Sequence, residues 1–406
     1  MQFGYHIAKR LSFNTQHSFT KTITSLAITA VSISVFVVIL AFGILLGFKK
    51  EIREKVRGYA GDITVTKYQL ASGNETNLFK VDPLLIMDVG QQEPISSIYP
   101  IIQKAGILKS DSTVEGVVFK GVPAGYDFSF YAKHLIKGNI PKYTDSTDSY
   151  DILVSNYTAS ILDLDTGSLV NLYFIDQSNV RRRRPRIVGI FDTGLKEFDK
   201  QFALADIRSI QRIVGNNYTN ISGYEVKIND QKSIDICRSL LEEKFDYNYA
   251  INSIRELHPA MFQWLDIVDT NVAVIITLMF LVAIINMSTM LLILIIDRIP
   301  MIGIFKSMGA ESRKIGSIFN WQGGYILVGG LIAGNIVALS FAFLQNKYKL
   351  ISLNADTYYM DAVPFFLPFE YLIIINLGAL ILSFIFTYIP VRLIHKIEPT
   401  RSIQFK

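Results

Sequence analysis

The segment DRIPMIGIFKSMGA, residues 297–310, lies between two long hydrophobic runs, Val272–Ile296 and Ile315–Leu344. The segment is short and basic, whereas each run is long enough to cross a bilayer core, which takes about 20 residues of helix. Segments of this kind end one membrane helix, turn along the membrane surface and begin the next. The sequence therefore predicts a membrane protein built around this turn.

The composition agrees with a protein that lies partly in a membrane and partly in water. Of its 406 residues, 50% are hydrophobic and 18% are charged, with a formal net charge of +5. This is too apolar for an ordinary soluble protein and too charged for one that lies entirely in a bilayer. The single cysteine, Cys237, excludes an internal disulfide and is predicted to be buried.

Hydropathy predicts a membrane protein with four transmembrane α-helices and a large extracytoplasmic α/β domain between the first and the second. The first apolar run exceeds the h-region of a signal peptide and no A-x-A-like site follows it, so we interpret it as an uncleaved span. The predicted segments are the cytoplasmic arm 1–22, the span 23–48, the extracytoplasmic domain 49–268, the span 269–296, the cytoplasmic segment 297–314, the span 315–344, the extracytoplasmic loop 345–370, the span 371–391 and the cytoplasmic tail 392–406.

The domain at 49–268 is predicted to mix helices and strands. It opens with a charged helical extension, Lys49–Arg57, and a half-buried strand, Asp62–Lys67, whose residues alternate between apolar and polar. Polar stretches at 143–150 and 176–179 predict seams between two subdomains. Further strands are expected at 98–102, 106–108, 114–120, 151–154, 168–174, 186–191 and 223–228, and helices at 81–88, 156–162, 204–213 and 231–243.

Basic residues near the membrane ends gather in the arm, the segment 297–314 and the tail. By the positive-inside rule these three segments are cytoplasmic, which places the domain and the loop 345–370 outside. The net charge is thereby explained without a nucleic-acid partner. The run Arg181–Arg184 is interpreted as a solvated hairpin tip, and a patch for phosphate or an acidic partner is the alternative.

The sequence carries no signature of catalysis. It lacks a G-x-x-x-x-G-K-[ST] loop and a G-x-S-x-G elbow, and its five histidines are scattered without metal-ligand spacing. Residues 23–48, 271–296, 315–344 and 371–391 include no charged residue, which argues against a proton or ion pathway. We therefore predict no catalytic, cofactor or metal site, and energy that arrives from another subunit.

Small and polar residues in the spans are candidates for helix packing. Asn286, Asn320, Gln322, Asn335 and Asn376 are expected to form hydrogen bonds between helices. The third span also holds glycines that either let helices approach closely or reflect the general frequency of glycine in membrane helices. These glycines are Gly323, Gly324, Gly329, Gly330 and Gly334.

The stretch Arg298–Ala310 resembles the R-x-x-E-I-G-x-L-[KR]-A-[LM]-G-A signature of the FtsX/MacB-type ABC transporter permeases. Three further stretches, Val188–Ile207, Tyr358–Leu372 and Pro390–Ile403, resemble the LolC/LolE lipoprotein-releasing branch. The order of one span, a large outer domain and three more spans matches as well, so the resemblance covers essentially the whole chain. One departure is Met301, which stands where the family usually has an acidic residue.

The resemblance implies that the segment 297–314 contacts an ATPase. The residues that would carry this coupling are Arg298, Ile302, Gly303, Phe305, Lys306, Met308 and Gly309. Ile302, Phe305 and Met308 recur at helical spacing, so we predict one apolar face with Phe305 as its anchor and Gly309 as the helix stop. On the first span, Ile33, Phe36, Leu40 and Ile44 share a face that either receives acyl chains or contacts plain lipid.

The function that the resemblance implies is that of a non-catalytic permease subunit in the bacterial inner membrane, with both termini cytoplasmic. ATP would be bound by an ABC-type ATPase partner, and its hydrolysis would release lipoproteins by mechanotransmission. Further expected partners are a second permease, either self or a paralogue, membrane lipid and the lipoprotein; a periplasmic carrier is left open. An FtsX-like activator of a cell-wall hydrolase and a MacB-like efflux subunit are the alternatives, although FtsX outer domains are shorter and MacB carries a fused ATPase.

Overall fold

The computed structural model describes residues 18–68, 78–111, 113–176, 179–215, 218–230, 233–354, 358 and 360–391. The chain forms two compact units. The helical unit comprises Met1–Lys50, Trp264–Ser352 and Val363–Lys406, and the α/β unit comprises Glu51–Gln263 and Leu353–Ala362. The α/β unit therefore includes part of the loop predicted at 345–370. The arm before residue 18 and the predicted tail 392–406 lie outside the described residues.

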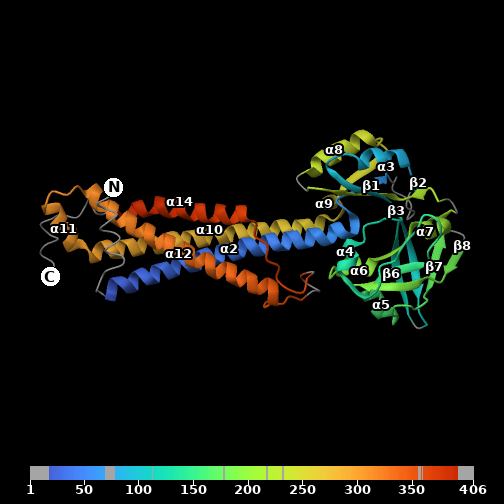
Figure 1. Ribbon diagram of the computed structural model, residues 1–406, viewed down its shortest axis with the longest axis horizontal. Coiled ribbons are helices and arrows are strands. Elements are labelled where there is room, and N and C mark those ends of the chain that lie inside the picture. Colours follow the sequence, from blue (N-terminus) through green and yellow to red (C-terminus); the bar gives the residue numbers. More distant parts are fainter. Residues whose placement is uncertain are drawn as a thin grey trace. The chain divides into compact units, whose positions relative to one another are not determined.

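The helical unit is built from long helices and one short one (Figure 1). In chain order these are α2 (Ser18–Ala60), α10 (Pro259–Asp297), α11 (Ile299–Ser307), α12 (Ser312–Tyr348) and α14 (Phe369–Val391). Every apolar run predicted as a span is helical. The charged extension Lys49–Arg57 continues α2 without a break, as predicted.

The number of membrane spans is only partly determined. Among the described residues, α2 from Thr22, α10 and α12 are long and apolar enough to cross a membrane. In α14 the corresponding apolar stretch, Phe369–Leu382, is shorter. The count of four spans therefore stays a prediction.

Close approach between helices depends on glycine in α12. A Cβ atom at Gly330 would lie 2.5 Å from Val31 of α2, and one at Gly334 would lie 2.8 Å from the carbonyl oxygen of Ser32. By contrast, a Cβ atom at Gly324 would meet nothing within 4 Å. The prediction that small residues bring helices together is thus confirmed for Gly330 and Gly334 and is wrong for Gly324.

A pair of amides also joins two helices. Asn335 of α12 and Asn376 of α14 exchange side-chain hydrogen bonds of 2.7 and 3.1 Å, and each also donates to a backbone carbonyl of its own helix. The predicted interhelical role of these two asparagines is confirmed. A reciprocal pair of this kind satisfies polar groups that lipid cannot.

Valine at Gly334 should weaken the packing of α12 on α2. The new side chain would overlap the backbone of Ser32 and the side chain of Val35, and overpacking costs about 1–3 kcal/mol. The measurement is unfolding of the purified protein in mixed micelles, with Gly324→Val as the matched control. Equal losses of stability in the two variants would contradict this account of the α2–α12 contact.

The α/β unit contains thirteen strands and seven helices within the described residues. The strands are β1 (Ile63–Lys67), β2 (Phe79–Lys80), β3 (Ile95–Lys109), β4 (Val114–Val122), β5 (Leu135–Gly138), β6 (Asp151–Ser155), β7 (Asn171–Asp176), β8 (Asn179–Arg183), β9 (Arg186–Phe191), β10 (Phe202–Asp206), β11 (Asn220–Ile221), β12 (Gly223–Ile228) and β13 (Tyr249–Ser253). The helices are α3 (Pro83–Gly90), α4 (Ser129–Lys133), α5 (Asn156–Leu162), α6 (Lys196–Gln201), α7 (Ile207–Val214), α8 (Ile234–Lys244) and α9 (Ile254–Leu257).

Local side chains explain where several helices begin. Asp82 precedes Pro83 and accepts hydrogen bonds from the first turn of α3, and Ser155 caps α5 in the same way. Ser253 and Glu256 form a reciprocal capping box at α9. These starts come from short-range chemistry, which is why the predicted α5 agrees with the observed one.

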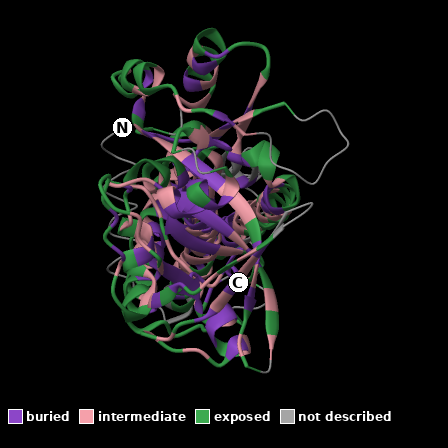
Figure 2. Cartoon of the chain, turned by 90° about the vertical axis from the view of Figure 1, so that its right-hand side faces the viewer, coloured by how far each residue is buried: buried purple, intermediate pink, exposed green. Residues whose placement is uncertain are grey.

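One long strand connects the two halves of the sheet. The strand order is β13-β1-β12-β3-β4-β10-β6-β9-β5, with β7 also paired to β3 and β8 paired to β7. Strand β3 pairs with β12 through Ile95–Ile101 and with β4 through Ile102–Lys109. We call the part with β1, β12 and β13 the β12 half and the part from β4 onward the β4 half. The sheet strands are largely buried, and the helices around them keep exposed faces (Figure 2).

Two details of the prediction are wrong. The segments 98–102 and 106–108 form one continuous strand, β3, rather than two. Residues 204–206 belong to strand β10, so the helix predicted at 204–213 begins only at Ile207. The seams predicted at 143–150 and 176–179 stay a prediction, and residues 177–178 lie outside the described residues.

The arginine run lies in a hairpin, as predicted, but along a strand. Arg181, Arg182 and Arg183 belong to β8, which pairs with β7. Arg182 donates to Asn171 at 2.7 Å, and Arg181 donates to the carbonyl of Ile213. Cys237 is fully buried, which confirms that prediction.

Candidate functional sites

The first candidate site is the short helix α11 between α10 and α12. Its last turn closes with a hydrogen bond from the Ala310 N–H to the Phe305 carbonyl (2.9 Å) and one from the Gly309 N–H to the Lys306 carbonyl (3.0 Å). This is a Schellman motif, which needs a left-handed residue after the helix. Gly309 supplies it with φ +86°. The prediction that Gly309 stops the helix is confirmed.

The predicted apolar face of α11 is wrong. Ile302 is completely buried against Ile295 of α10 and Ile315 and Phe319 of α12, and Phe305 packs partly against the same cluster. Met308 lies beyond the last helical residue and is 77% exposed. The three residues therefore do not share one surface, because the first two hold the turn together.

The other predicted coupling residues lie around this packed core. Gly303 is buried, Lys306 stands in the last turn, and Arg298 precedes the helix and forms an ion pair with Asp297 at 3.4 Å. Met301 packs against the buried cluster. An apolar residue fits this position, which accounts for methionine where the family signature has an acid.

A different apolar pair faces outward from α11. Ile304 is 53% exposed, and Met308, the residue that follows α11, is 77% exposed. Arg313 and Lys314, at the start of α12, are also exposed. We call these two exposed residues, Ile304 and Met308, the outward pair. Residue spacing in the sequence did not reveal the outward pair, because the burial of Ile302 decides which side of α11 faces α10 and α12.

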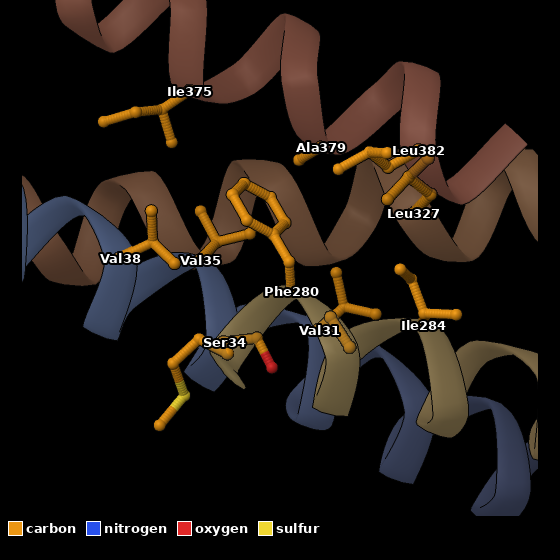
Figure 3. A pocket seen from close by; sticks show the side chains of 12 residues that line it. Val31, Ser34, Val35, Val38, Phe280, Ile284, Leu327, Ile375, Ala379 and Leu382 are labelled. Carbon is orange, nitrogen blue, oxygen red and sulfur yellow. The ribbon is translucent and has the colours of Figure 1, made fainter. Parts of the chain in front are cut away.

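The second candidate site is an apolar cavity inside the helical unit. Its volume is about 20 Å³, and it is lined by α2, α10, α12 and α14 (Figure 3). Ser34 is its single polar side chain among the lining residues. The lining residues are Val31, Ser34, Val35, Val38, Met279, Phe280, Ala283, Ile284, Leu327, Ile375, Ala379 and Leu382.

The face predicted to receive acyl chains does not line this cavity. Ile33 is 56% exposed, and Phe36, Leu40 and Ile44 are half-buried. The ring of Phe36 packs edge-on against Phe341 of α12, with centroids 6.1 Å apart. The cavity is lined from α2 by the series at 31, 34, 35 and 38 instead. The spacing of that series and the lone serine are the signals that could have located it.

Beyond the cavity, a non-helical segment lies against α2. The Phe366 N–H donates to the Gly43 carbonyl at 3.0 Å, and a Cβ atom at Gly43 would overlap the ring of Phe365. A Cβ atom at Gly47 would lie 2.5 Å from the carbonyl oxygen of Pro364. These two glycines, one turn apart, form the shallow surface that accepts Pro364–Phe366.

The buried side chain of Gln345 holds both ends of the loop 351–363, which leads into Pro364–Phe366. Its amide nitrogen donates to the carbonyls of Ile351 and Val363 at 3.2 and 2.9 Å, and its oxygen accepts from the Ile351 N–H at 3.0 Å. Non-helical backbone is tolerated near a bilayer only where protein satisfies it. Gln345 performs this task here.

Helices α2 and α10 are also joined directly. Lys49 forms an ion pair with Asp269, and the ring of Phe48 packs edge-on against Trp264 with centroids 6.4 Å apart. The charged extension of α2 is therefore more than a solvated surface. It holds α10 beside α2 at the end of the apolar run.

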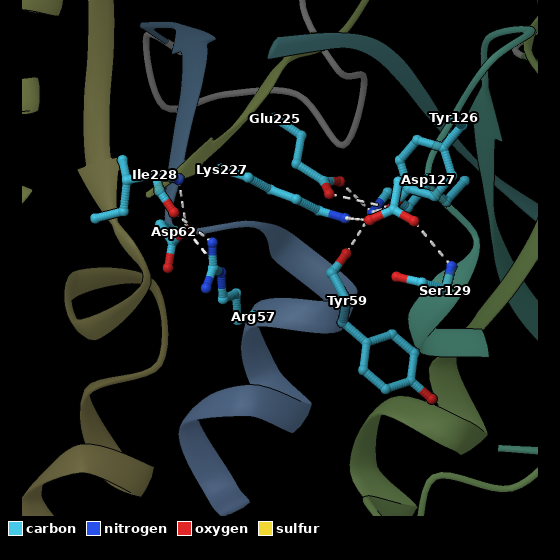
Figure 4. A network of polar contacts seen from close by, with 10 residues as sticks. Arg57, Tyr59, Asp62, Tyr126, Asp127, Ser129, Glu225, Lys227 and Ile228 are labelled. Atoms are coloured by element: carbon cyan, nitrogen blue, oxygen red, sulfur yellow. Dashed lines mark hydrogen bonds and ion pairs between the residues drawn. The ribbon is translucent and has the colours of Figure 1, made fainter. Parts of the chain in front are cut away.

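The third candidate site is the polar cluster at the C-terminal end of α2, within the α/β unit (Figure 4). Lys120 donates to the Tyr59 carbonyl and forms an ion pair with Glu225, and both charged side chains are almost fully buried. Arg57 pairs with Asp62 at 2.8 Å. Lys120, at the end of the predicted strand 114–120, is the one signal that the sequence offers for this cluster.

The side chain of Tyr59 lies in an aromatic cage. Its ring stacks on Phe198 with centroids 4.9 Å apart, and its hydroxyl donates to Asp199, which also accepts from the hydroxyl of Thr193 at 2.9 Å. Burial raises the pKa of Asp199 to about 6, although the hydrogen bonds from Tyr59 and Thr193 oppose the shift. The remaining rings of the cage are Phe130, Tyr131, Phe191 and Phe202.

Asp199 should make the α/β unit less stable as pH rises. The pKa of Asp199 is about 6 in the folded chain, above the ordinary value of 3.8. The contribution of Asp199 to the free energy of unfolding is therefore fully present below about pH 4 and is lost as pH rises through about 6. The loss is on the order of 2 to 3 kcal/mol.

Asp199→Asn should remove this part of the pH dependence. Urea unfolding of the purified chain, followed by tyrosine circular dichroism between pH 4 and 7, measures it. A variant that keeps the wild-type pH profile would refute the assignment.

Among the described residues, no group of three or more His, Cys, Asp or Glu side chains could hold a metal ion. Long apolar helices joined to a separate α/β unit define the class: a membrane permease with a large domain outside the bilayer.

Comparisons with known proteins identify the family within that class. Residues 24–244 match the MacB-like periplasmic core domain, and residues 273–399 match the FtsX-like permease C-terminal domain. The chain belongs to the FtsX/MacB family of ABC transporter permeases. The resemblance recognised from residues 298–310 is confirmed.

Among the relatives are lipoprotein-releasing system transmembrane proteins. LolC of Xylella fastidiosa strain 9a5c is 22% identical, with 96% of each chain covered. LolC of Neisseria meningitidis serogroup B is 21% identical with the same coverage, and LolE of Haemophilus influenzae is 23% identical over 77% of this chain and 78% of its own. The periplasmic region of MacB from Actinobacillus actinomycetemcomitans aligns with a TM-score of 0.36 at 15% identity, over 51% of this chain and 95% of its own.

Proposed function

We propose that this chain is the permease subunit that releases lipoproteins from the outer leaflet of the inner membrane, driven by ATP hydrolysis in a partner subunit. The proposal is supported by the apolar pocket where α2, α10, α12 and α14 meet, whose lining is apolar except for Ser34. Its volume of about 20 Å³ is smaller than an acyl chain, so in the proposed mechanism movement of the helices opens it to the chain. The names of relatives matched over nearly the whole chain support this cargo.

The energy source is an ABC-type ATPase, and a second permease, either another copy or a paralogue, completes the assembly. The chain itself binds no ATP and performs no chemistry. In this arrangement both termini and α11 are cytoplasmic, and the α/β unit is periplasmic. A periplasmic carrier that takes the released lipoprotein is consistent with this placement.

The outward pair Ile304 and Met308 is where the ATPase docks. Apolar side chains that stay exposed beside basic residues are a common form of docking surface, and few such residues dominate binding. Ile302 and Phe305 act indirectly, because they fix the orientation of α11 against α10 and α12.

Replacing the outward pair with serine, Ile304→Ser with Met308→Ser, should weaken binding of the ATPase by about tenfold or more. The affinity of the purified ATPase for the solubilised permease measures this. Ser307→Ala, an exposed neighbour on the same helix, is the control and should bind as wild type. Unchanged binding by the double variant would place the docking surface elsewhere.

A photo-crosslinker in the cavity should capture a lipid-modified protein. Ile284 lines the cavity, whereas the next residue, Ile285, is 53% exposed on the outside of α10. We expect crosslinks to lipoprotein from position 284 that disappear when ATP is added with the ATPase, and crosslinks to bulk lipid alone from position 285. Bulk lipid at both positions, unchanged by ATP, would contradict lipoprotein release and favour an FtsX-like signalling role.

A further inference from the structure

The C-terminal end of α12 exposes apolar side chains and lysines together. We call residues 343–351, which lie in the helical unit, the terminal segment. Lys347 and Lys349 are both exposed in it. Its exposed apolar side chains, each between 41% and 65% exposed, are those of Phe343, Leu344, Tyr348, Leu350 and Ile351. The terminal segment therefore offers one surface chemistry to hydrocarbon and another to negative charge.

The length of α12 places the terminal segment at the surface of a bilayer. Arg313 and Lys314 are exposed directly before the apolar run Ile315–Leu344, which keeps that end of the helix in water. The run extends about 45 Å at 1.5 Å per residue, and a bilayer with its headgroups is about 40–45 Å thick. The terminal segment thus lies at the level of the headgroups, where tyrosine is enriched and lysine directs its charge outward.

The two lysines of the terminal segment carry charge that the protein does not neutralise. Among the described residues, neither Lys347 nor Lys349 has a carboxylate partner. The Lys347 ammonium lies 5.8 Å from the ring centre of Phe343 and 5.3 Å from that of Tyr348. A ring face attracts a cation but leaves the ammonium N–H groups available to an acceptor. An anion at this surface would meet two such donors.

Hydrogen bonds hold the terminal segment in one conformation. The Lys349 N–H donates to the Gln345 carbonyl at 2.8 Å, with Lys349 in the left-handed region at φ +50°. The Ile351 N–H donates to the Gln345 side chain at 3.0 Å, and the Asn346 amide donates to the Phe365 carbonyl at 3.1 Å. Glycine adopts a left-handed helix end with less strain than lysine does. Backbone stability therefore does not explain the lysine at position 349.

We propose that the terminal segment binds an anionic phospholipid, with Lys347 and Lys349 at its phosphate and the exposed apolar residues against its acyl chains. A zwitterionic headgroup carries its own cation beside the phosphate and gains less from the two lysines. A free phosphate would leave the apolar residues uncovered, which favours lipid as the occupant. The proposal goes beyond the proposed function, and only the assignment to the outer leaflet depends on α11 being cytoplasmic.

The double variant Lys347→Gln with Lys349→Gln tests the headgroup contact. Each lysine near an anionic headgroup is worth about a fivefold change in affinity. Native mass spectrometry of the purified full chain, titrated with phosphatidylglycerol or with phosphatidylcholine of the same acyl chains, gives the dissociation constant of each lipid. The wild type should prefer phosphatidylglycerol about 25-fold, and the double variant should bind the two lipids equally.

Lys109→Gln with Lys142→Gln is the matched control. It removes the same charge from two exposed positions in the α/β unit, so it should keep the wild-type preference. A wild type that does not prefer phosphatidylglycerol, or a Lys347 and Lys349 variant that still does, would overturn the proposal. Loss of the preference in the control would also overturn it, because net charge rather than position would then decide binding.

Glycerol 3-phosphate distinguishes a lipid from a free phosphate ester. It carries a phosphate ester but no acyl chains, so it should not displace bound phosphatidylglycerol at equal concentration. Displacement at equal concentration would overturn the assignment to lipid. These measurements require neither the ATPase nor a lipoprotein. A failure of lipoprotein release would therefore leave their outcome unchanged, and a failure of lipid binding would leave the proposed function standing.

Discussion

Backbone polar groups must be satisfied inside a bilayer, and the helical unit follows from this constraint. Lipid offers no hydrogen bonds, so a chain that crosses it forms uninterrupted helices. Where the chain is not helical, at Pro364–Phe366, glycines in α2 and the side chain of Gln345 supply the contacts that water would otherwise give. The same constraint explains why charged residues are absent between the ends of the long apolar runs.

Polar chemistry is concentrated instead in the α/β unit, where α2 ends. There a lysine, two carboxylates and several tyrosines are buried together around Tyr59. Burying these groups is costly unless they are paired, and the pairing is specific to one arrangement of helix and strands. Within the helical unit, burial of Ile302 gives α11 a comparable fixed orientation.

Features that depend on neighbouring residues could be predicted from the sequence. The apolar runs, the stop at Gly309, the start of α5 and the arginine-bearing hairpin all follow from local composition. Features that depend on tertiary contacts could not. The buried side of α11 is decided by Ile295 and Phe319, and the cavity lining by helices far apart in the chain. The cluster at Tyr59 joins residues 59, 120, 199 and 225, and nothing short-range connects them.

The account requires α11 and the α/β unit to lie on opposite sides of the membrane. Cysteines introduced at Ser146, exposed in the α/β unit, and at Met308, exposed beyond α11, report this with a membrane-impermeant thiol reagent in spheroplasts. The native Cys237 is buried and serves as the background. The account predicts labelling at position 146 in intact spheroplasts and at position 308 only after lysis. Labelling of both positions from the same side, or the reverse order, would contradict it.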